Sequence, residues 1–198
     1  MFTVDKKKVI LTDCDGVLLD WFVAFEEWMS IRGYNSIAGF DGVYNVNEIF
    51  GVPKGVTKPL VKEFNNSAWM LDLSPLGGAI KYVKKLHEEY GYVFHCITSL
   101  SDDPKAAKLR MMNLENVFGK GIFTKVECLP CGADKDASLE MYRESECFWI
   151  EDKKENADLG IELGLDSILI AHDHNYSYNG QAKRCQDWKE IYNYIIGE

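Results

Sequence analysis

The sequence lacks any long apolar segment. No uninterrupted apolar run approaches the roughly 18 residues that a helix needs to span a bilayer. The first 16 residues, MFTVDKKKVILTDCDG, place charges before an apolar run of strand length, which is too short for the core of a signal peptide. We therefore expect a cytoplasmic protein without a membrane partner.

Basic residues are scarce relative to acidic ones. Lys and Arg total 22 against 31 for Asp and Glu, which gives a formal net charge of −9. Binding of a nucleic-acid duplex needs a broad positive field that displaces counterions, so this balance disfavours a nucleic-acid partner. A small phosphorylated ligand is compatible with it, because one lysine and one metal ion can create a local positive site on an acidic protein.

Proline is also sparse, with 5 residues among 198, and there is no low-complexity tract or internal repeat. With 46% hydrophobic and 27% charged residues, the composition is that of a globular protein and argues against disorder. Because no secretory signal is evident, we interpret the 6 cysteines as reduced thiols. The length favours one substantial domain with a smaller insertion.

Four short apolar runs, separated by helical periodicity, predict a parallel sheet covered on both faces. The runs are residues 9–12, 92–97, 147–150 and 167–171. Apolar stripes of helical spacing occur over residues 80–86 and 188–196. Each run ends in polar residues, so we expect a doubly wound α/β domain whose ligand site lies at the carboxyl edge of the sheet.

Residues 17–74 break this alternation, because they contain no convincing strand. One helical stripe comprises Leu18, Trp21, Phe22, Phe25, Trp28 and Met29. Loops over residues 33–47 and a second helix over residues 58–64 follow before the sheet resumes. We predict an α/β core over residues 1–16 and 75–198, with residues 17–74 inserted after the first strand as a small helical cap.

The most informative motif is DCDGV, which runs from Asp13 to Val17 directly after the first strand. Two carboxylates beyond a strand end can leave the backbone on the same side if the chain turns, and Gly16 permits that turn. Close carboxylates repel each other, so the pair implies a metal ion or a division of acid and base roles. The alternative is a solvated turn or a partial calcium loop. The calcium pattern fails because Val17 stands where a third Asp or Asn is needed.

Three further polar features fall at the same predicted edge of the sheet. Glu151 and Asp152 end a later strand. Thr98 and Ser99 end another strand ahead of a helix, a junction that suits an anion. Lys135 lies between these two features in the chain. Carboxylates for a hard cation, hydroxyls for phosphoryl oxygens and one lysine for charge neutralisation together indicate phosphoryl transfer.

These residues, in this order, resemble the four motifs of the haloacid dehalogenase superfamily. The matching motifs are Asp13-x-Asp15-Gly16-Val17, Thr98-Ser99, Lys135, and Glu151-Asp152 with Asn156. The resemblance covers nearly the whole chain and is closest to the 5'(3')-deoxyribonucleotidase group. Cues for that group are Asp20-Trp21, Leu73-Ser74-Pro75-Leu76-Gly77-Gly78-Ala79 and Asp187-Trp188-Lys189. The resemblance implies Mg²⁺-dependent hydrolysis of a small phosphate ester, with nucleoside monophosphates as the expected substrates.

The resemblance also implies roles for individual residues. Asp13 would be the nucleophile that attacks phosphorus and forms an aspartyl-phosphate. Asp15 would protonate the leaving oxygen and then act as base for the hydrolytic water. Thr98 and Ser99 would bind phosphoryl oxygens. Lys135 would screen the charge of the nucleophile and the phosphate, in agreement with the repulsion between an anionic nucleophile and an anionic ester.

A magnesium site follows from the same resemblance. The ion would be held by the Asp13 carboxylate, the Asp15 backbone carbonyl and Asp152. The group usually has two aspartates where this chain has Glu151 and Asp152. We therefore assign the metal to Asp152 first, with Glu151 as a further ligand that reaches the ion through water.

Other residues compete for two of these assignments. Lys120 and Lys125 also precede the last motif, and Lys135 is favoured because it follows a strand and a loop at the start of a helix. A zinc site is an alternative use of cysteine and histidine. Its ligands would be Cys128, Cys131, His172 and His174. The two pairs lie far apart in the sequence and Pro130 suits a plain turn, which argues against zinc.

Aromatic residues of the predicted cap are candidates for contact with a nucleobase. The resemblance places Trp21 where a ring would face the base, and stacking on a base is worth about 1–3 kcal/mol. Trp69, Tyr44 and Phe40 are further candidates. Because Trp21 also belongs to an apolar stripe, packing inside the cap is the alternative.

Three rival functions fit parts of the same pattern. The first two are a phosphatase for another small ester, such as a sugar phosphate, and a phosphatase for nucleic-acid ends, which the net charge of −9 disfavours. The third is a catalytically silent binding protein that keeps the fold. The presence of Asp13, Asp15 and Thr98 argues against the third, because a disused site has no physical need for them.

Overall fold

A six-stranded parallel sheet forms the centre of the computed structural model, which describes residues 8–39 and 42–197. The strands are β1 (Val9–Thr12), β2 (Val93–Ser99), β3 (Phe123–Leu129), β4 (Phe148–Glu151), β5 (Asp166–Ile170) and β6 (Lys183–Cys185). Their order in the sheet is β3-β2-β1-β4-β5-β6, and every neighbouring pair is parallel. The chain therefore leaves β1 in one direction to build β2 and β3, and returns to its other side for β4.

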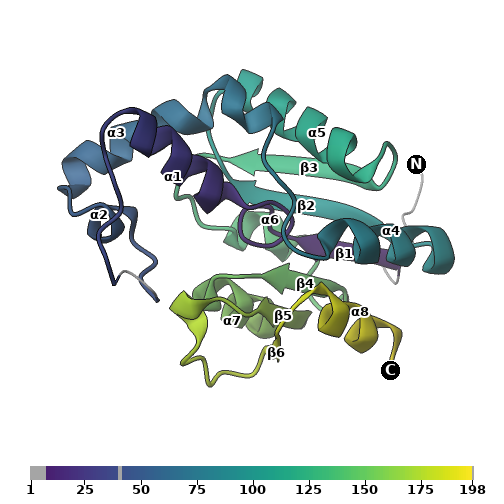
Figure 1. Cartoon of the computed structure of the whole chain (residues 1–198). Helices are drawn as coiled ribbons and strands as arrows, with labels where there is room; N and C mark the ends of the chain where they lie inside the picture. The colour runs from purple at the N-terminus through teal and green to yellow at the C-terminus, as the bar shows by residue number, and fades with distance from the viewer. Residues whose placement is uncertain (1–7, 40–41, 198) are drawn as a thin grey trace.

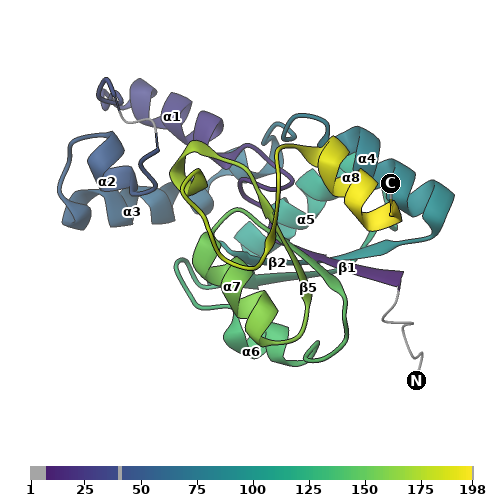
Figure 2. The same ribbon diagram turned by 90° about the horizontal axis from the view of Figure 1, so that it is seen from below.

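Helices cover both faces of the sheet, as Figures 1 and 2 show. One face carries α4 (Ala79–Tyr90), α5 (Pro104–Phe118) and α8 (Trp188–Ile196), and the other carries α6 (Asp136–Glu140) and α7 (Lys154–Glu162). Alternate residues of β1 point to opposite faces of the sheet. Ile10 packs in the core cluster that includes residues of α4, α5 and α8, whereas Val9 and Leu11 pack in a second cluster. The predicted doubly wound α/β architecture is confirmed.

Two strands of this sheet were not among the four predicted from apolar runs. In β3, Lys125 and Glu127 alternate with apolar residues and form an ion pair at 2.7 Å. The other strand, β6, has only 3 residues and begins with Lys183 and Arg184. Both lie at the edges of the sheet, where one side of the strand has no partner strand among the described residues. A search for continuous apolar runs detects buried central strands and misses edge strands of this kind.

Between β1 and α4, the described residues form helices and loops. The helices are α1 (Trp21–Ile31), α2 (Val46–Ile49), α3 (Lys54–Asn65) and the short 3₁₀ helix η2 (Ala68–Leu71). Figure 1 shows α1, α2 and α3 gathered at one end of the sheet, on the left of the view. The chain enters and leaves this segment side by side, since Leu19 bridges Pro75 and the Asp20 amide donates to the Ser74 carbonyl at 2.8 Å. The division into core and cap stays a prediction.

Element boundaries differ from the predicted ones in detail. The stripe that begins at Leu18 forms a helix only from Trp21, because the Asp20 side chain caps the helix by accepting from the Val23 amide. The helix predicted over residues 58–64 begins earlier, at Lys54. A 3₁₀ turn, η3 (Asp173–Asn175), lies between β5 and β6. Within residues 8–39 and 42–197, no helix combines the length and apolar character needed to cross a membrane.

Candidate active site

The candidate site lies where the strand order reverses beside β1. In an open parallel sheet, this switch point is where the loops after neighbouring strands diverge and leave room for a ligand. A cavity of about 620 Å³ opens there. Among the residues that line it are the predicted catalytic and metal-binding residues, the two hydroxyl residues and one aromatic candidate: Asp13, Asp15, Trp21, Thr98, Ser99, Lys135, Glu151 and Asp152.

The loop after β1 makes a tight turn that brings Gly16 close to Asp152. The amides of Leu18 and Leu19 donate to the Cys14 carbonyl at 2.8 and 3.0 Å. Gly16 has a φ of 74°, and a Cβ atom at this position would lie 2.6 Å from the Asp152 Oδ2 atom. Glycine is therefore required both for the left-handed conformation and for the close approach of the loop to Asp152.

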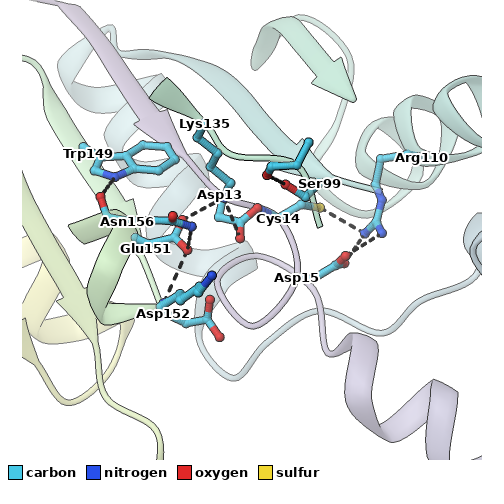
Figure 3. Close-up of polar contacts among 12 residues, drawn as sticks. Asp13, Cys14, Asp15, Ser99, Arg110, Lys135, Trp149, Glu151, Asp152 and Asn156 are labelled. Carbon is cyan, nitrogen blue, oxygen red and sulfur yellow. Dashed lines mark hydrogen bonds and ion pairs between the residues drawn. The ribbon is translucent and has the colours of Figure 1, made fainter. Parts of the chain in front are cut away.

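Lys135 is the basic residue at the centre of the site. Its Nζ atom lies 2.8 Å from Asp13 Oδ2 and 2.8 Å from Glu151 Oε2, as Figure 3 shows. Only 2% of the lysine is exposed, and burial by itself would lower its pKa. The carboxylates of Asp13 and Glu151 outweigh burial and raise the pKa of Lys135, so the ammonium form is held in place. The alternatives Lys120 and Lys125 do not line the cavity.

Three carboxylates converge beside this lysine. One oxygen from each of Asp13, Glu151 and Asp152 lies within 4.8 Å of the other two. Burial and the neighbouring Asp13 raise the pKa of Glu151 to about 7, and burial and the charges of Glu151 and Asp13 raise that of Asp152 well above its usual range. Lys135 balances part of this negative charge, and a cation would balance the rest. Clustered carboxylate oxygens suit Mg²⁺, a hard ion of small radius.

Glu151 and Asp152 differ in how they are held. Glu151 is fully buried and accepts from Asn156 Nδ2 at 3.0 Å and from the Lys153 amide at 3.3 Å, in addition to Lys135. Its carboxylate is therefore fixed in a position that orients the lysine. Asp152 instead faces the turn at Gly16, and its Oδ2 atom lies 3.5 Å from His174 Nε2. This arrangement makes Asp152 the more accessible metal ligand of the pair.

The two hydroxyl residues at the end of β2 also differ. Both Thr98 and Ser99 line the cavity, and Thr98 is buried. The Ser99 hydroxyl donates to the Ala133 carbonyl at 2.8 Å, across to the loop that leads to Lys135. A hydroxyl has one hydrogen to donate, so in this conformation Ser99 does not offer it to a phosphoryl oxygen as expected. Its hydroxyl instead holds the neighbouring loop.

Arg110 is a site residue that the sequence analysis missed. It comes from α5, is fully buried, and pairs with Asp15 through both terminal nitrogens, at 2.6 Å to Oδ1 and 3.0 Å to Oδ2. Burial raises the pKa of Asp15, and Arg110 partly offsets that effect. A sequence signal exists, because Arg110 shares a helical face with the buried residues Ala106, Asn113 and Leu114. A charged residue on an otherwise buried face indicates a buried partner.

Two aromatic rings line the cavity from the segment between β1 and α4, Trp21 on α1 and Tyr44 in the loop before α2. The Trp21 indole donates from Nε1 to Asn65 Oδ1 at 2.9 Å and stacks on Phe25 with ring centres 4.6 Å apart. Trp21 lines the cavity and Phe25 does not, so Phe25 supports the indole from behind. Tyr44 also lines the cavity and packs edge-on against His174, with ring centres 5.0 Å apart.

The other two aromatic candidates lie elsewhere. Trp69 lines a second, smaller groove together with Asp20 and Ala68, and it does not line the cavity that holds Asp13. Phe40 lies outside the described residues.

The histidines of the alternative zinc site have other partners. His172 donates from Nε2 to the Gly16 carbonyl at 2.7 Å, and His174 donates from Nε2 to the Asp152 carbonyl at 3.1 Å. The group of potential metal ligands found among the described residues is the carboxylate cluster, and it includes no cysteine or histidine. The structure therefore places the two histidines as supports for the loops that carry Gly16 and Asp152.

Comparison with known proteins gives one similar sequence. No protein-family model matches the chain. An uncharacterised 32.4 kDa protein from the Gp30–rIII intergenic region of Enterobacteria phage T4 is 25% identical over 202 residues. The match covers 96% of this chain and 70% of the phage protein.

Comparison with solved structures gives clear matches over nearly the full length. A haloacid dehalogenase-like family hydrolase from Streptococcus pneumoniae has a TM-score of 0.67 and 14% identity, covering 97% of this chain and 100% of that one. The D,D-heptose 1,7-bisphosphate phosphatase from B. bronchiseptica, solved with magnesium and phosphate, has a TM-score of 0.60 and 10% identity, covering 96% and 98%. An L-2-haloacid dehalogenase has a TM-score of 0.56 and 11% identity, covering 96% and 99%. The chain therefore has the fold of the haloacid dehalogenase-like hydrolases, among which are phosphatases and dehalogenases.

Proposed function

We propose that the protein is a Mg²⁺-dependent phosphomonoester hydrolase that acts on nucleoside monophosphates through an aspartyl-phosphate on Asp13. The observation that carries the proposal is the Lys135 ammonium group held 2.8 Å from Asp13 Oδ2 beside the buried carboxylates of Glu151 and Asp152. A buried lysine and a divalent ion would together offset the negative charges that an anionic nucleophile and a phosphate ester bring to one place.

The first chemical step would transfer the phosphoryl group to the protein. An Asp13 carboxylate oxygen attacks phosphorus in line, so that a bond forms from this oxygen to phosphorus and the bond from phosphorus to the ester oxygen breaks. Asp15, which lines the same cavity, donates its proton to the departing oxygen and prevents the release of an alkoxide. Lys135 stays paired with Asp13 and Glu151 and faces the phosphoryl oxygens with its charge.

The second step would hydrolyse the aspartyl-phosphate. Asp15, now ionised, takes a proton from water as the water oxygen attacks phosphorus, and the bond from phosphorus to Asp13 breaks. Phosphate leaves and both aspartates return to their starting states. The donor set of Asp13, Asp152 and the backbone near Asp15 would hold Mg²⁺, which when bound supplies positive charge next to the phosphoryl oxygens.

The proposed preference for nucleotides is supported by the aromatic walls of the cavity. Trp21 is held by Asn65 and Phe25 in one orientation, and a prearranged ring loses little freedom when a base stacks on it. The cavity volume of about 620 Å³ lies within the range of sites for small molecules. Residues 17–74, as a helical cap, would close over the phosphate, exclude bulk water and set the substrate class.

Phosphate release from a panel of esters tests this proposal. With Mg²⁺ present, we expect nucleoside monophosphates to be hydrolysed with a kcat/KM about 5- to 150-fold above that of glycerol phosphate, since base stacking is worth about 1–3 kcal/mol. Trp21→Leu should remove most of that preference and leave glycerol phosphate hydrolysis little changed. Trp69→Leu, in the separate groove, is the matched control. Equal rates for nucleotides and glycerol phosphate would refute the nucleotide preference, and no release from any ester would refute the hydrolase.

A sugar phosphate is the second candidate substrate. One solved structure with this fold is a phosphatase of a heptose bisphosphate. The cavity also has polar groups that could bind sugar hydroxyls, among them Asp20, Asn65 and Asp134. The same panel separates the two candidates. A sugar phosphatase would have its highest kcat/KM on hexose or heptose phosphates, and Trp21→Leu would not selectively lower its kcat/KM on nucleotides.

A further inference from the structure

Arg110 is a buried cation that does not contact the cavity. Its side chain is 0% exposed, and it is absent from the cavity lining. Both of its terminal nitrogens meet the Asp15 carboxylate, at 2.6 Å and 3.0 Å, and Nη1 also lies 3.1 Å from Cys14 Sγ. A substrate in the cavity would therefore meet Asp15 and not Arg110.

Stability alone gives a poor account of this residue. Removing a guanidinium group from water costs several kcal/mol, and hydrophobic residues of similar volume often replace buried ion pairs without loss. The Arg110 Nε atom is also buried and has no hydrogen-bond partner in the described structure, so the group is incompletely satisfied. Arg110 pairs with Asp15, a residue that is 23% exposed and faces the proposed reaction.

The pairing fixes the direction of the Asp15 carboxylate. Arg110 Nη2 donates to Asp15 Oδ2 at 3.0 Å, and Arg110 Nη1 forms an ion pair with Asp15 Oδ1 at 2.6 Å, although Oδ1 is buried and makes no hydrogen bond in the described structure. A guanidinium fork that contacts both oxygens holds the carboxylate plane as well as its position. Because Oδ1 is buried, Oδ2 is the oxygen whose remaining lone pair can face the cavity and exchange a proton there.

We propose that Arg110 is the positioning residue for Asp15, holding its carboxyl group where it protonates the leaving oxygen of the substrate. The inference rests on the proposed hydrolase function. Arg110 acts on the reaction only through Asp15 and the turn at Cys14, so it contributes to departure of the leaving group and not to phosphate binding.

Leaving groups of different basicity distinguish this role from a structural one. An alkoxide is strongly basic and needs a proton as it departs, whereas p-nitrophenolate leaves without one. Loss of an oriented acid should therefore reduce kcat/KM for an alkyl phosphate and affect p-nitrophenyl phosphate much less. The ratio kcat/KM includes only steps up to release of the alcohol or phenol, so hydrolysis of the aspartyl-phosphate does not enter.

The experiment compares Arg110→Met and Arg110→Lys with the wild-type chain on both esters. For Arg110→Met we expect kcat/KM to fall about 100-fold or more on a nucleoside monophosphate and less than about tenfold on p-nitrophenyl phosphate. Arg110→Lys keeps the charge but not the fork, so it should show the same selective loss to a smaller extent and guards against failure of Arg110→Met to fold. In the presence of Asp15→Asn, Arg110→Lys should cause no further selective loss.

Asn113→Leu is the matched structural control. Asn113 is buried on the same helix, and its side chain donates to the Leu73 carbonyl at 3.2 Å rather than to a residue of the site. We expect this variant to change both esters by the same factor. An equal loss on both esters in the Arg110 variants, or no loss, would overturn the positioning role while leaving the hydrolase intact. If the wild-type chain hydrolyses neither ester, the proposed function itself fails.

Discussion

The two halves of the candidate site each place one fully buried cation against one aspartate of the DCDGV motif, but they balance charge differently. On one side Lys135 meets two carboxylates, those of Asp13 and Glu151, with Asp152 close by. On the other side Arg110 pairs with one carboxyl group among the described residues, that of Asp15. The lysine half holds three carboxyl groups against one cation and can accept a divalent ion, whereas the arginine half holds one carboxyl group against one cation.

This difference suggests how one short loop can support two roles. The lysine half brings together the charges that must surround a transferred phosphoryl group. The arginine half isolates one carboxyl group and fixes its direction, which is what a group that donates and accepts a proton requires. The four predictions below test whether the two halves are separate in this sense.

The largest effect is expected when the two aspartates are exchanged for asparagine one at a time. Asp13→Asn removes the proposed nucleophile and should lower kcat by at least about 1,000-fold on every ester. Asp15→Asn should lower kcat/KM strongly for a nucleoside monophosphate and much less for p-nitrophenyl phosphate. Phosphate or phenol release measures both. Asp136→Asn, which changes an exposed carboxylate at the start of α6, is the control.

A smaller effect concerns stability, measured by urea unfolding of the metal-free protein. Lys135→Met leaves two buried carboxylates without their cation and should lower the free energy of unfolding by about 3–5 kcal/mol. Arg110→Met leaves only Asp15, which is 23% exposed and can be hydrated, so we expect a loss of about 1–3 kcal/mol. If Arg110→Met were the more destabilising change, the claim that Lys135 balances more buried negative charge than Arg110 would be wrong.

Magnesium should act on the lysine half alone. Binding to the folded state stabilises it by about 2.7 kcal/mol when the free ion is at 100 times its dissociation constant. We expect Mg²⁺ to raise the Tm of the wild-type chain and of Arg110→Lys to a similar extent, and to have no effect on Asp152→Asn. Differential scanning fluorimetry with and without EDTA measures the shift. Loss of the Tm shift in Arg110→Lys would show that Mg²⁺ binding depends on Arg110, and the two halves would then not be separate.

The smallest effect separates the pH response of the site from that of the rest of the fold. His95 lies on β2, its Nδ1 atom is 2.7 Å from the Tyr142 hydroxyl, and burial lowers its pKa. The folded protein therefore keeps His95 neutral where the unfolded chain, with a pKa near 6.5, takes up a proton. This stabilising contribution is present above pH 6.5 and is lost as the pH falls through the lowered pKa of the folded state.

His95→Gln should consequently lose less stability than the wild-type chain when urea unfolding is compared at pH 7.5 and pH 5. Tyr142→Phe removes the hydrogen bond but keeps the histidine, so its dependence on pH should stay close to that of the wild-type chain. If His95→Gln lost as much free energy of unfolding between pH 7.5 and pH 5 as the wild-type chain, the loss would come from other groups, such as the site carboxylates, and not from His95.

The two halves also differ in how far the sequence could predict them. Asp13, Glu151 and Lys135 follow strands or begin helices, and local sequence patterns reveal such ends. Arg110 lies inside a helix, and its partner is 95 residues away in the chain. The sequence indicates Arg110 only through its helical spacing, because it lies on the same buried face of α5 as Ala106 and Leu114.

Other features depended on three-dimensional contacts that the sequence does not express. The Ser99 hydroxyl was expected to face phosphate, but the loop that carries Ala133 comes close enough to accept its hydrogen. The imidazoles of His172 and His174 bond to backbone carbonyls of loops that the sequence places far from them. The parallel sheet and the helices on both faces followed from local patterns, whereas these contacts follow from how the loops pack.

A crystal structure with Mg²⁺ and trifluoroberyllate, a mimic of a phosphoryl group, tests the central claim most directly. The account predicts beryllium bonded to an Asp13 carboxylate oxygen, Lys135 Nζ in contact with a fluoride, and the ion ligated by Asp13 and Asp152. Binding of the ion and the mimic away from Asp13, or no binding at saturating concentrations, would contradict it.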